Sequence, residues 1–307
     1  KEDIDSFISA STADIFVRRM LIDTSTMNLG THAQSVVDQL DNWNRPPLSD
    51  LENSRIDWLS YINDKSVNLA GKKKPMPHQT EALEAARKGL EMADRGKIIM
   101  ACGTGKTFTS LIIAEELAGK GKLVLYMVPS LALMSQTVQS WKNDSEEEFY
   151  AYSACSDKKV GQKSNTLDLI RTSPTDLAFP ATTDPQLLAE QVKLQVGGDM
   201  VVVFSTYQSI DVISKAQKDH GMPEFDLILC DEAHRTTGVT LEGEDDSNFV
   251  RIHENENVKG KKRLYMTATP RVYGEKAQAK ADEHDATLAA MDDESVFGKT
   301  FYYRGFG

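Results

Sequence analysis

The chain has 307 residues, of which 40% are apolar and 26% charged, a balance that excludes an intrinsically disordered chain and a membrane protein. Its three cysteines are too few and too scattered for a disulfide framework or a zinc knuckle, and they favour the reducing cytoplasm. The formal net charge of −11 argues against a nucleic-acid-binding surface, which is usually basic.

The acidic charge is concentrated in two places. Residues 241–258 and residues 281–294 together carry the whole excess of acidic over basic side chains, so the rest of the chain is neutral. This distribution weakens the argument against nucleic acid without establishing a basic surface. The longest apolar stretch, residues 123–134, is interrupted by Pro129-Ser130 and is too short to cross a bilayer, so we expect no membrane partner.

The first part of the chain differs in character from the rest. Residues 1–44 predict polar helix and one possible strand at residues 18–23, without an obvious core. Residues 45–74 contain two consecutive prolines and three consecutive lysines, and they predict a linker or docking strap. The larger apolar side chains of this strap are Ile56, Trp58 and Tyr61.

From about residue 96 onward, short apolar runs alternate with helical patterns. The expected strands are residues 97–101, 122–128, 149–154, 200–205, 226–230 and 263–267. The expected helices are residues 80–93, 106–118, 131–141, 186–194 and 207–218, and the expected long loops are residues 161–185 and 240–262. This alternation predicts an α/β fold, a mostly parallel sheet flanked by helices, with sites at the carboxyl ends of the strands.

A glycine-rich segment follows the first of these strands and leads directly into a helix. Its residues are Ala101, Cys102, Gly103, Thr104, Gly105, Lys106 and Thr107. Glycines allow backbone N–H groups to converge on phosphate, and the helix N-terminus adds positive potential. Lys106 would reach the β- and γ-phosphates, and Thr107 would ligate magnesium. Met100 stands where the usual phosphate-loop pattern has its first glycine, and a glycine-rich turn without a ligand is the alternative.

Two acidic residues, Asp231 and Glu232, follow the strand expected at residues 226–230. Beside a phosphate loop, Asp231 would hold the water shell of magnesium, and Glu232 would orient and deprotonate the attacking water. Acidic residues at a strand end are by themselves more often helix caps or solvated charges. Their position after the phosphate loop, each motif at the end of a strand, favours a site that hydrolyses ATP.

This set of motifs resembles that of the superfamily 2 helicases and translocases, whose motors are built from RecA-like P-loop NTPase domains. The resemblance implies further site residues. Gln79, in the sequence Pro-His-Gln, is similar to the Q motif and would bond the adenine edge. His234 completes a DEAH-type box, and Thr267 and Thr269 lie in a Thr-Ala-Thr-Pro sequence that resembles motif III. His234, Thr267 and Thr269 would couple the nucleotide state to the nucleic-acid site.

Two more segments resemble nucleic-acid-binding motifs of the same superfamily. The first is motif Ia, with Pro129 and Ser130. The second is motif Ib, with Ser205, Thr206, Tyr207 and Gln208. Both lie where a strand turns into a helix, so hydroxyl and N–H groups there would hold the phosphates of one nucleic-acid strand. A helix cap is an equally good interpretation, and the sequence does not separate the two.

The closer resemblance is to the restriction-associated branch, which includes the single-chain type ISP enzymes and the type III restriction subunits. It rests on residues 51–58, 231–238, 265–273 and 295–303. It implies the tail of an upstream nuclease-like domain at residues 1–44, a linker at 45–74, a first RecA-like domain at 75–297 and the start of a connector to a second RecA-like domain at 298–307. No Asp…Glu-x-Lys cleavage cluster is evident, so we expect no DNA cleavage by this segment.

The resemblance implies a motor that uses ATP and magnesium to move on double-stranded DNA as part of a restriction-modification enzyme. Its expected partners are the second RecA-like domain and the nuclease, methyltransferase or specificity modules of a parent protein. Because the second domain supplies an arginine finger, we expect the segment alone to hydrolyse ATP weakly. An RNA helicase or remodeller motor stays open as an alternative, and so does a nucleotide-gated nucleic-acid-binding module.

Overall fold

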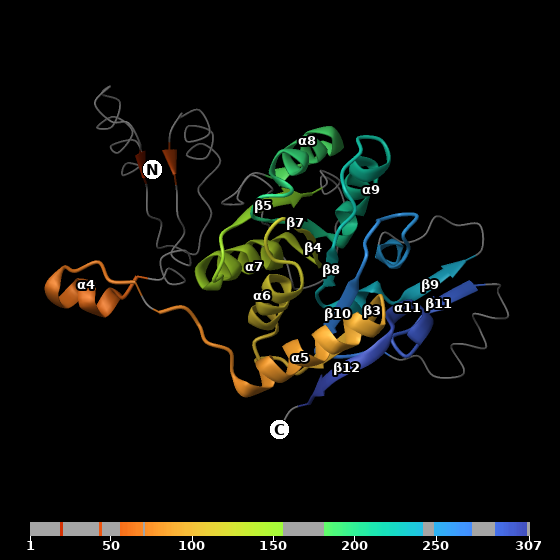
Figure 1. The fold of residues 1–307 in the computed structure, drawn as a ribbon, viewed down its shortest axis with the longest axis horizontal. Helices are drawn as coiled ribbons and strands as arrows, with labels where there is room; N and C mark the ends of the chain where they lie inside the picture. The colour runs from red at the N-terminus through yellow and green to blue at the C-terminus, as the bar shows by residue number, and fades with distance from the viewer. Residues whose placement is uncertain are drawn as a thin grey trace, which may run out of the picture. The chain divides into compact units, whose positions relative to one another are not determined.

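The computed structural model describes residues 19–20, 43–44, 56–69, 71–155, 181–241, 249–271 and 286–305. The chain divides into two compact units, residues 1–71 and residues 72–307, and each is described by itself (Figure 1). In the first unit, strands β1 (Arg19–Met20) and β2 (Trp43–Asn44) pair in parallel. β1 falls within the strand expected at residues 18–23, whereas the helix expected in residues 1–44 lies outside the described residues.

A short helix, α4 (Trp58–Asp64), occupies part of the segment expected to be a linker. The carboxylate of Asp57 caps it by accepting hydrogen bonds from two N–H groups of the first turn, both at 3.1 Å. The helix ends at Lys65, which adopts a left-handed conformation with φ of 62°. The linker expected at residues 45–74 therefore contains regular structure.

The second unit contains one eight-stranded sheet in which all neighbouring strands are parallel, in the order β12-β3-β10-β8-β4-β7-β5-β6. These strands are β3 (Arg95–Met100), β4 (Leu123–Val128), β5 (Phe149–Ala154), β6 (Ala181–Thr182), β7 (Met200–Thr206), β8 (Leu227–Cys230), β10 (Arg263–Thr267) and β12 (Lys299–Arg304). All six expected strands form, with small shifts at their ends. The topology confirms the predicted RecA-like α/β fold.

Helices cover both faces of this sheet (Figure 1). On one face lie α5 (Pro77–Met92), α6 (Lys106–Leu117) and α7 (Leu131–Asp144). On the other face lie α8 (Pro185–Gln195), α9 (Ile210–Lys218), α11 (Glu294–Phe297) and the 3-10 turns η2 (Tyr207–Ser209), η3 (Ala233–Thr236) and η4 (Arg251–His253). None of the helices in the described part of the chain is long and apolar enough to cross a membrane.

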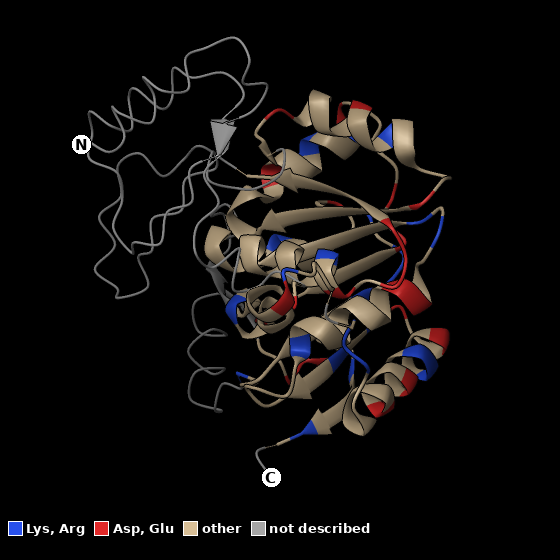
Figure 2. Ribbon diagram, turned by 90° about the vertical axis from the view of Figure 1, so that its left-hand side faces the viewer, with Lys and Arg blue, Asp and Glu red and all other residues tan. Residues whose placement is uncertain are grey.

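Strand β4 shows why a central strand of this sheet has an unbroken apolar sequence. Alternate side chains point to opposite faces, so Leu123, Leu125 and Met127 pack in the core beneath α8 and α9. The intervening side chains of β4 pack in the core beneath α6 and α7. All six are buried, and burying a large aliphatic side chain stabilises a fold by roughly 1.5–3 kcal/mol. Figure 2 shows charged residues on helices and loops, while β4 and β7 carry none.

Two expectations about loops need correction. Strand β9 (Gly238–Leu241) pairs antiparallel with β11 (Ala286–Ala289), and η4 follows, so the long loop expected at residues 240–262 contains regular structure at both places. The loop expected at residues 161–185 ends in β6, which adds to the sheet beside β5. β6 and β9 are short, and each forms by pairing with a strand distant in sequence, which a local sequence pattern does not reveal.

The sheet also extends beyond the boundary expected at residue 297. Residues 299–304 were expected to begin a connector, yet they form β12, which pairs in parallel with β3. A bulge between Thr300 and Tyr302 shifts the register. The ring of Phe301 occupies the space above Gly89 of α5 and Gly96 of β3, where any Cβ would overlap it. The absence of side chains at these two glycines thus allows β12 to close this edge of the sheet.

Candidate nucleotide-binding site

The phosphate loop joins the end of β3 to the start of α6. Gly103 and Gly105 both have φ of 80°, a left-handed conformation that residues with a Cβ rarely adopt. The hydroxyl of Thr104 donates to the carbonyl of Ala101 at 2.7 Å and closes the turn. Gly105 is the N-cap of α6 and provides no side-chain cap, which suits the first turn of the helix to an anion such as phosphate.

Lys106 and Thr107 occupy the first turn of α6. The carbonyl of Thr107 accepts hydrogen bonds from Nε1 of Trp141 at 3.1 Å and from Oγ of Ser110 at 2.7 Å. The indole of Trp141 is fully buried and packs edge-on against Tyr126 of β4, with ring centroids 5.1 Å apart. These contacts fix the start of α6 against the sheet, and with it the two side chains expected at phosphate and magnesium.

Asp231 follows β8 and is 8% exposed. Burial, and then the neighbouring charge of Glu232, raise the pKa of the Asp231 carboxyl to about 6, while the charge of Lys106 opposes this rise. One carboxylate oxygen of Asp231 accepts the N–H of Glu232 at 2.9 Å. A buried carboxylate with so little compensating charge suits a divalent cation.

Magnesium fits the donors at this place. It prefers oxygen ligands, and it usually binds one or two protein groups together with nucleotide phosphates and water. The carboxylate of Asp231 and the hydroxyl of Thr107 are donors of that kind. Among the described residues, no cluster of three or more His, Cys, Asp or Glu side chains could hold a metal ion. Thr107 and Asp231 stay the predicted ligands.

The backbone of the acidic pair is unusual. Glu232 has φ of 47° and ψ of 46°, a left-handed conformation that costs a residue with a Cβ about 1–3 kcal/mol and persists where surrounding structure imposes it, often at active sites. The hydroxyl of Tyr207 donates to the carbonyl of Asp231 at 2.8 Å, and its ring is fully buried. Tyr207 therefore holds the end of β8 in place, a role that the sequence did not reveal.

The DEAH box contacts motif III directly. Nδ1 of His234 lies 3.0 Å from the hydroxyl of Thr267 and 3.3 Å from a carboxylate oxygen of Glu232. The same hydroxyl accepts the N–H of Thr269 at 3.1 Å. Burial lowers the pKa of His234, and the charge of Glu232 opposes this change. The structure thus brings together His234, Thr267 and Thr269, the three residues predicted to couple the two sites.

Gln79 is buried against the phosphate loop. Its Oε1 accepts the N–H of Met76 at 2.9 Å, and its Nε2 donates to the carbonyls of Thr104 at 3.2 Å and Gly105 at 3.5 Å. Nε2 of His78 also donates to the carbonyl of Thr104, at 2.9 Å. The whole amide of Gln79 is therefore bonded to the protein, and its contact with adenine stays a prediction.

Comparisons with known proteins agree with these motifs. Residues 72–272 match the family described as the type III restriction enzyme res subunit. The chain belongs to this family. Residues 1–68 also match a restriction endonuclease family, which bears on the nuclease-like tail predicted at residues 1–44 without fixing its boundary. No curated protein matches the chain.

The solved structures that resemble this res-subunit chain include two type ISP enzymes. The type ISP restriction-modification enzyme LlaBIII bound to DNA is 38% identical with a TM-score of 0.73, and the match covers 99% of this chain and 20% of that enzyme. A nuclease-deletion mutant of the type ISP enzyme LlaGI, in complex with a DNA substrate mimic, is 39% identical with a TM-score of 0.57 and coverage of 76% and 20%. The chain thus spans about a fifth of both relatives. These matches confirm a superfamily 2 motor domain close to restriction enzymes.

In the two segments predicted to bind nucleic acid, most side chains are buried or hydrogen-bonded within the protein. Pro129 is buried, and Oγ of Ser130 caps α7 by accepting the N–H of Leu133 at 3.3 Å. The side chains of motif Ib are buried except for that of the exposed Gln208; the buried ones are Ser205, Thr206 and Tyr207. Because burial withdraws these three side chains from a ligand, their predicted contact with nucleic acid now depends on backbone groups.

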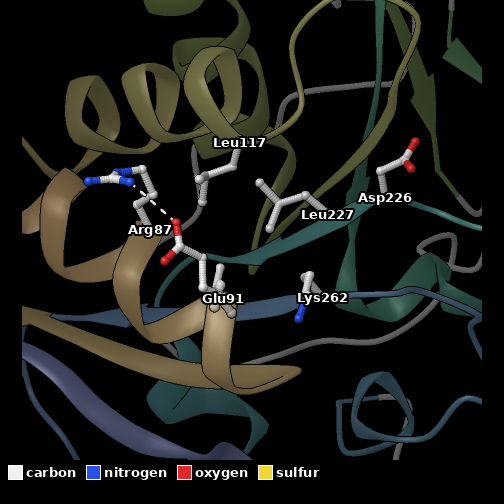
Figure 3. A pocket seen from close by; sticks show the side chains of 7 residues that line it. Arg87, Glu91, Leu117, Asp226, Leu227 and Lys262 are labelled. Carbon is white, nitrogen blue, oxygen red and sulfur yellow. Dashed lines mark hydrogen bonds and ion pairs between the residues drawn. The ribbon is translucent and has the colours of Figure 1, made fainter.

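The pocket drawn in Figure 3 lies at the amino ends of the sheet strands, opposite the ends that lead into the phosphate loop. It is lined by Arg87, Leu90, Glu91, Leu117, Asp226, Leu227 and Lys262, near the ends of α5 and α6 and the starts of β8 and β10. Arg87 is bonded there to Glu91 at 3.2 Å. This pocket is separate from the phosphate loop and contains none of the residues predicted to act on a nucleotide.

Proposed function

We propose that residues 72–307 form the ATP-binding motor domain of a DNA translocase within a restriction-modification enzyme. The arrangement that supports this proposal is the phosphate loop at the end of β3, the pair Asp231-Glu232 at the end of β8 and the hydroxyl of Thr267 at the end of β10. Both of these type ISP structures contain DNA or a DNA mimic, which favours DNA over RNA as the partner, and we propose that the DNA is double-stranded.

Each residue has a defined task in this proposal. The backbone of Gly103, Thr104 and Gly105 surrounds the phosphates, and Lys106 binds the β- and γ-phosphates. Thr107 and Asp231 would hold magnesium, which when bound would supply positive charge to the phosphates. Glu232 orients the attacking water and accepts its proton.

The coupling residues act beside Glu232. Because His234 contacts both Glu232 and Thr267, a shift of Glu232 on hydrolysis changes the hydrogen bonds of motif III. A second RecA-like domain, a nuclease and methyltransferase or specificity modules complete the proposed parent protein. An alternative from another class is a nucleotide-gated binding module, which would bind ATP tightly without turnover stimulated by DNA.

The phosphate-loop assignment is tested by calorimetric titration of the chain with ATP and magnesium. Lys106→Ala should weaken ATP binding by about a hundredfold, because it removes a charge-assisted bond to phosphate. The matched control is Lys88→Ala, on the exposed side of α5. Unchanged affinity in the Lys106 variant would refute the assignment.

The role of Glu232 is tested in a longer protein that includes the second motor domain. Glu232→Gln should bind ATP like the wild type and lose ATP hydrolysis by about 10²–10⁴-fold, the usual contribution of a general base. The control is Glu224→Gln, an exposed carboxylate ahead of β8. Wild-type turnover in the Glu232 variant would exclude this residue as the base.

A further inference from the structure

The phosphate loop leaves open which groups hold the other end of the nucleotide. Both polar ends of the Gln79 amide are bonded to the protein, to Met76 on one side and to Thr104 and Gly105 on the other. The amide keeps one acceptor lone pair on Oε1, so a contact of Gln79 with adenine would use that position alone. Other groups beside the loop would add to the recognition of the nucleoside.

Two elements border the loop on the side away from Asp231. The first turn of α5 contacts it through Gln79 and His78. The end of β12 contacts it through the backbone, because the N–H of Ala101 donates to the carbonyl of Arg304 at 2.9 Å. Figure 1 shows β12 running alongside α5. The last residues of β12 thus lie at the mouth of the phosphate loop.

The register of β12 places two of its side chains on the α5 side of the sheet. Tyr302 pairs with Ile98 and Arg304 with Met100, and both partners belong to the core beneath α5 and α6. The hydroxyl of Tyr302 donates to a carboxylate oxygen of Glu81 at 3.1 Å, and Tyr302 is also hydrogen-bonded to Arg304. Tyr302, Arg304 and Glu81 form one linked cluster, which we call the β12 ledge.

The ledge is firmly anchored. The bulge after Thr300 turns Phe301 toward the same core as Tyr302, and its ring lies against Gly89 and Gly96. Arg304 itself stays exposed at the end of the strand. A fixed strand end that presents an exposed guanidinium is suited to meet a ligand without rearranging.

We propose that the β12 ledge holds the adenine nucleoside of bound ATP, with Arg304 stacking on the base, Tyr302 supporting it and Glu81 accepting from an amino or hydroxyl group. A guanidinium plane and a phenol ring both stack on flat heterocycles, and a carboxylate accepts only from N–H or O–H donors. This inference rests on the proposed ATP site and adds its base-recognition residues.

The test compares two ligands by calorimetry in magnesium buffer. ATP carries base and phosphates, whereas tripolyphosphate carries phosphates alone. Arg304→Ala should weaken ATP binding about tenfold and leave tripolyphosphate binding unchanged, because stacking contributes only to the nucleoside. Arg304→Lys should lose most of the same affinity, since it keeps the charge without the plane. Tyr303→Ala is the control, because Tyr303 lies on the other side of the strand and is 67% exposed.

The outcomes distinguish failure of the β12 ledge from failure of the proposed ATP site. Loss of both ligands in Lys106→Ala, with selective loss of ATP in Arg304→Ala, supports both. Equal weakening of ATP and tripolyphosphate in Arg304→Ala would show that Arg304 acts on phosphate, and unchanged ATP binding would show that it does not act at all; either result overturns the ledge. Tripolyphosphate binding also verifies that the Arg304 and Tyr303 variants have a folded loop.

Discussion

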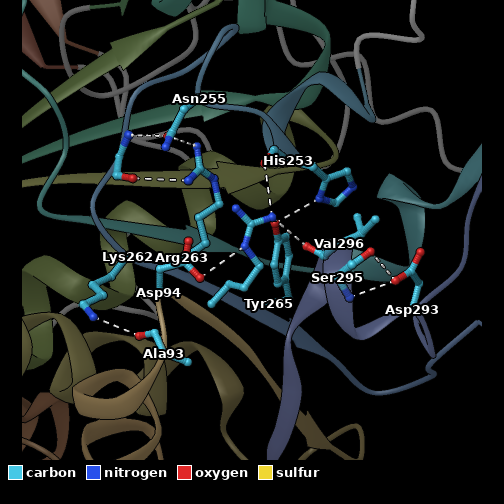
Figure 4. Close-up of polar contacts among 12 residues, drawn as sticks. Ala93, Asp94, His253, Asn255, Lys262, Arg263, Tyr265, Asp293, Ser295 and Val296 are labelled. Carbon is cyan, nitrogen blue, oxygen red and sulfur yellow. Dashed lines mark hydrogen bonds and ion pairs between the residues drawn. The ribbon is translucent and has the colours of Figure 1, made fainter.

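His253 is buried behind the DEAH box and links it to two other segments. Its Nε2 donates to the carbonyl of Thr236 at 3.1 Å. Its Nδ1 lies 2.9 Å from the hydroxyl of Tyr265 (Figure 4). The ring packs against Phe297 with centroids 4.6 Å apart. Burial favours the neutral imidazole, in which Nδ1 accepts from the hydroxyl of Tyr265.

The neutral state of His253 predicts a loss of stability in acid. Burial lowers its pKa from 6.5 to about 4, so the unfolded chain takes up a proton at a higher pH than the folded protein does. As pH falls from about 6.5 to about 4, this residue should lower the free energy of unfolding by about 3 kcal/mol. Urea unfolding of wild type and His253→Gln at several pH values measures this difference.

Glutamine is the informative replacement for His253, because its amide also offers one donor end and one acceptor end and does not titrate. The variant should therefore lose less stability than the wild type between neutral pH and pH ~4. His220→Gln, at a partly exposed histidine, provides a matched control. Parallel pH profiles for wild type and His253→Gln would refute the prediction.

At the scale of elements, β8 and β10 are joined by the contact between their carboxyl ends. Thr267 is fully buried, and its hydroxyl bonds both His234 and the N–H of Thr269. Thr267→Val keeps the shape and removes these bonds. In a longer protein with the second motor domain, we expect ATP affinity within about twofold of wild type and DNA-stimulated ATPase lower by about 5–150-fold, the range of a typical coupling energy.

The conservative substitution separates coupling from packing at this position. Thr267→Ser retains the hydroxyl and should retain most of the stimulation by DNA. If Thr267→Val were stimulated by DNA like the wild type, the contact between the DEAH box and motif III would not carry the coupling.

The contact of β12 with α5 and β3 gives a prediction about stability. Gly96→Ala should lower the free energy of unfolding by about 1–3 kcal/mol, because the new Cβ overlaps the ring of Phe301. Gly71→Ala is the control, since a Cβ there meets nothing within 4 Å. Urea unfolding measures both, and combining Gly96→Ala with Phe301→Leu should recover part of the loss. Equal stability of the two glycine variants would contradict this account of the edge.

The elements that the sequence predicted share strong local signals. Apolar runs such as residues 149–154 and 263–267 became strands with the same bounds, since both faces of the sheet are covered. Strand β12 was missed because its pattern is polar and its place depends on Gly89 and Gly96, which are distant in sequence. The three consecutive aromatic residues before Arg304 were the available signal.

Lys106, Asp231 and Glu232 stay the predicted site residues, and the sequence singled them out because chemistry and spacing coincide there. The candidate site was less predictable where tertiary packing decides what a side chain can reach. Tyr207 looked like a nucleic-acid contact and instead donates to the carbonyl of Asp231. Gln79 was expected at adenine and is bonded to the phosphate loop. Motif position alone does not tell whether a polar group is already satisfied.

At the scale of the whole chain, the acidic charge has a structural location. The two acidic windows, residues 241–258 and 281–294, are separated in sequence, yet β9, which ends where the first window begins, pairs antiparallel with β11, which lies within the second. Both windows therefore adjoin one two-stranded ribbon, and the ribbon is not part of the eight-stranded sheet. β9 and β11 themselves contain no Asp, Glu, Lys or Arg, so the acidic excess belongs to the residues that flank them in the sequence.

Because all its strands are parallel, the large sheet of the second unit has two different ends, one formed by the amino ends of the strands and one by their carboxyl ends. Every strand of the large sheet ends on the side of the phosphate loop, so the turns at residues 93–94, 119–122 and 197–199 gather on the other side. Lys120, in the second of these turns, is well exposed. A fluorophore or surface tether attached at this position would leave the proposed nucleotide site, at the carboxyl ends of the strands, unobstructed for single-molecule work. Maleimide reacts with thiols, so the label would be attached through Lys120→Cys after the exposed Cys102 of the phosphate loop has been replaced by serine.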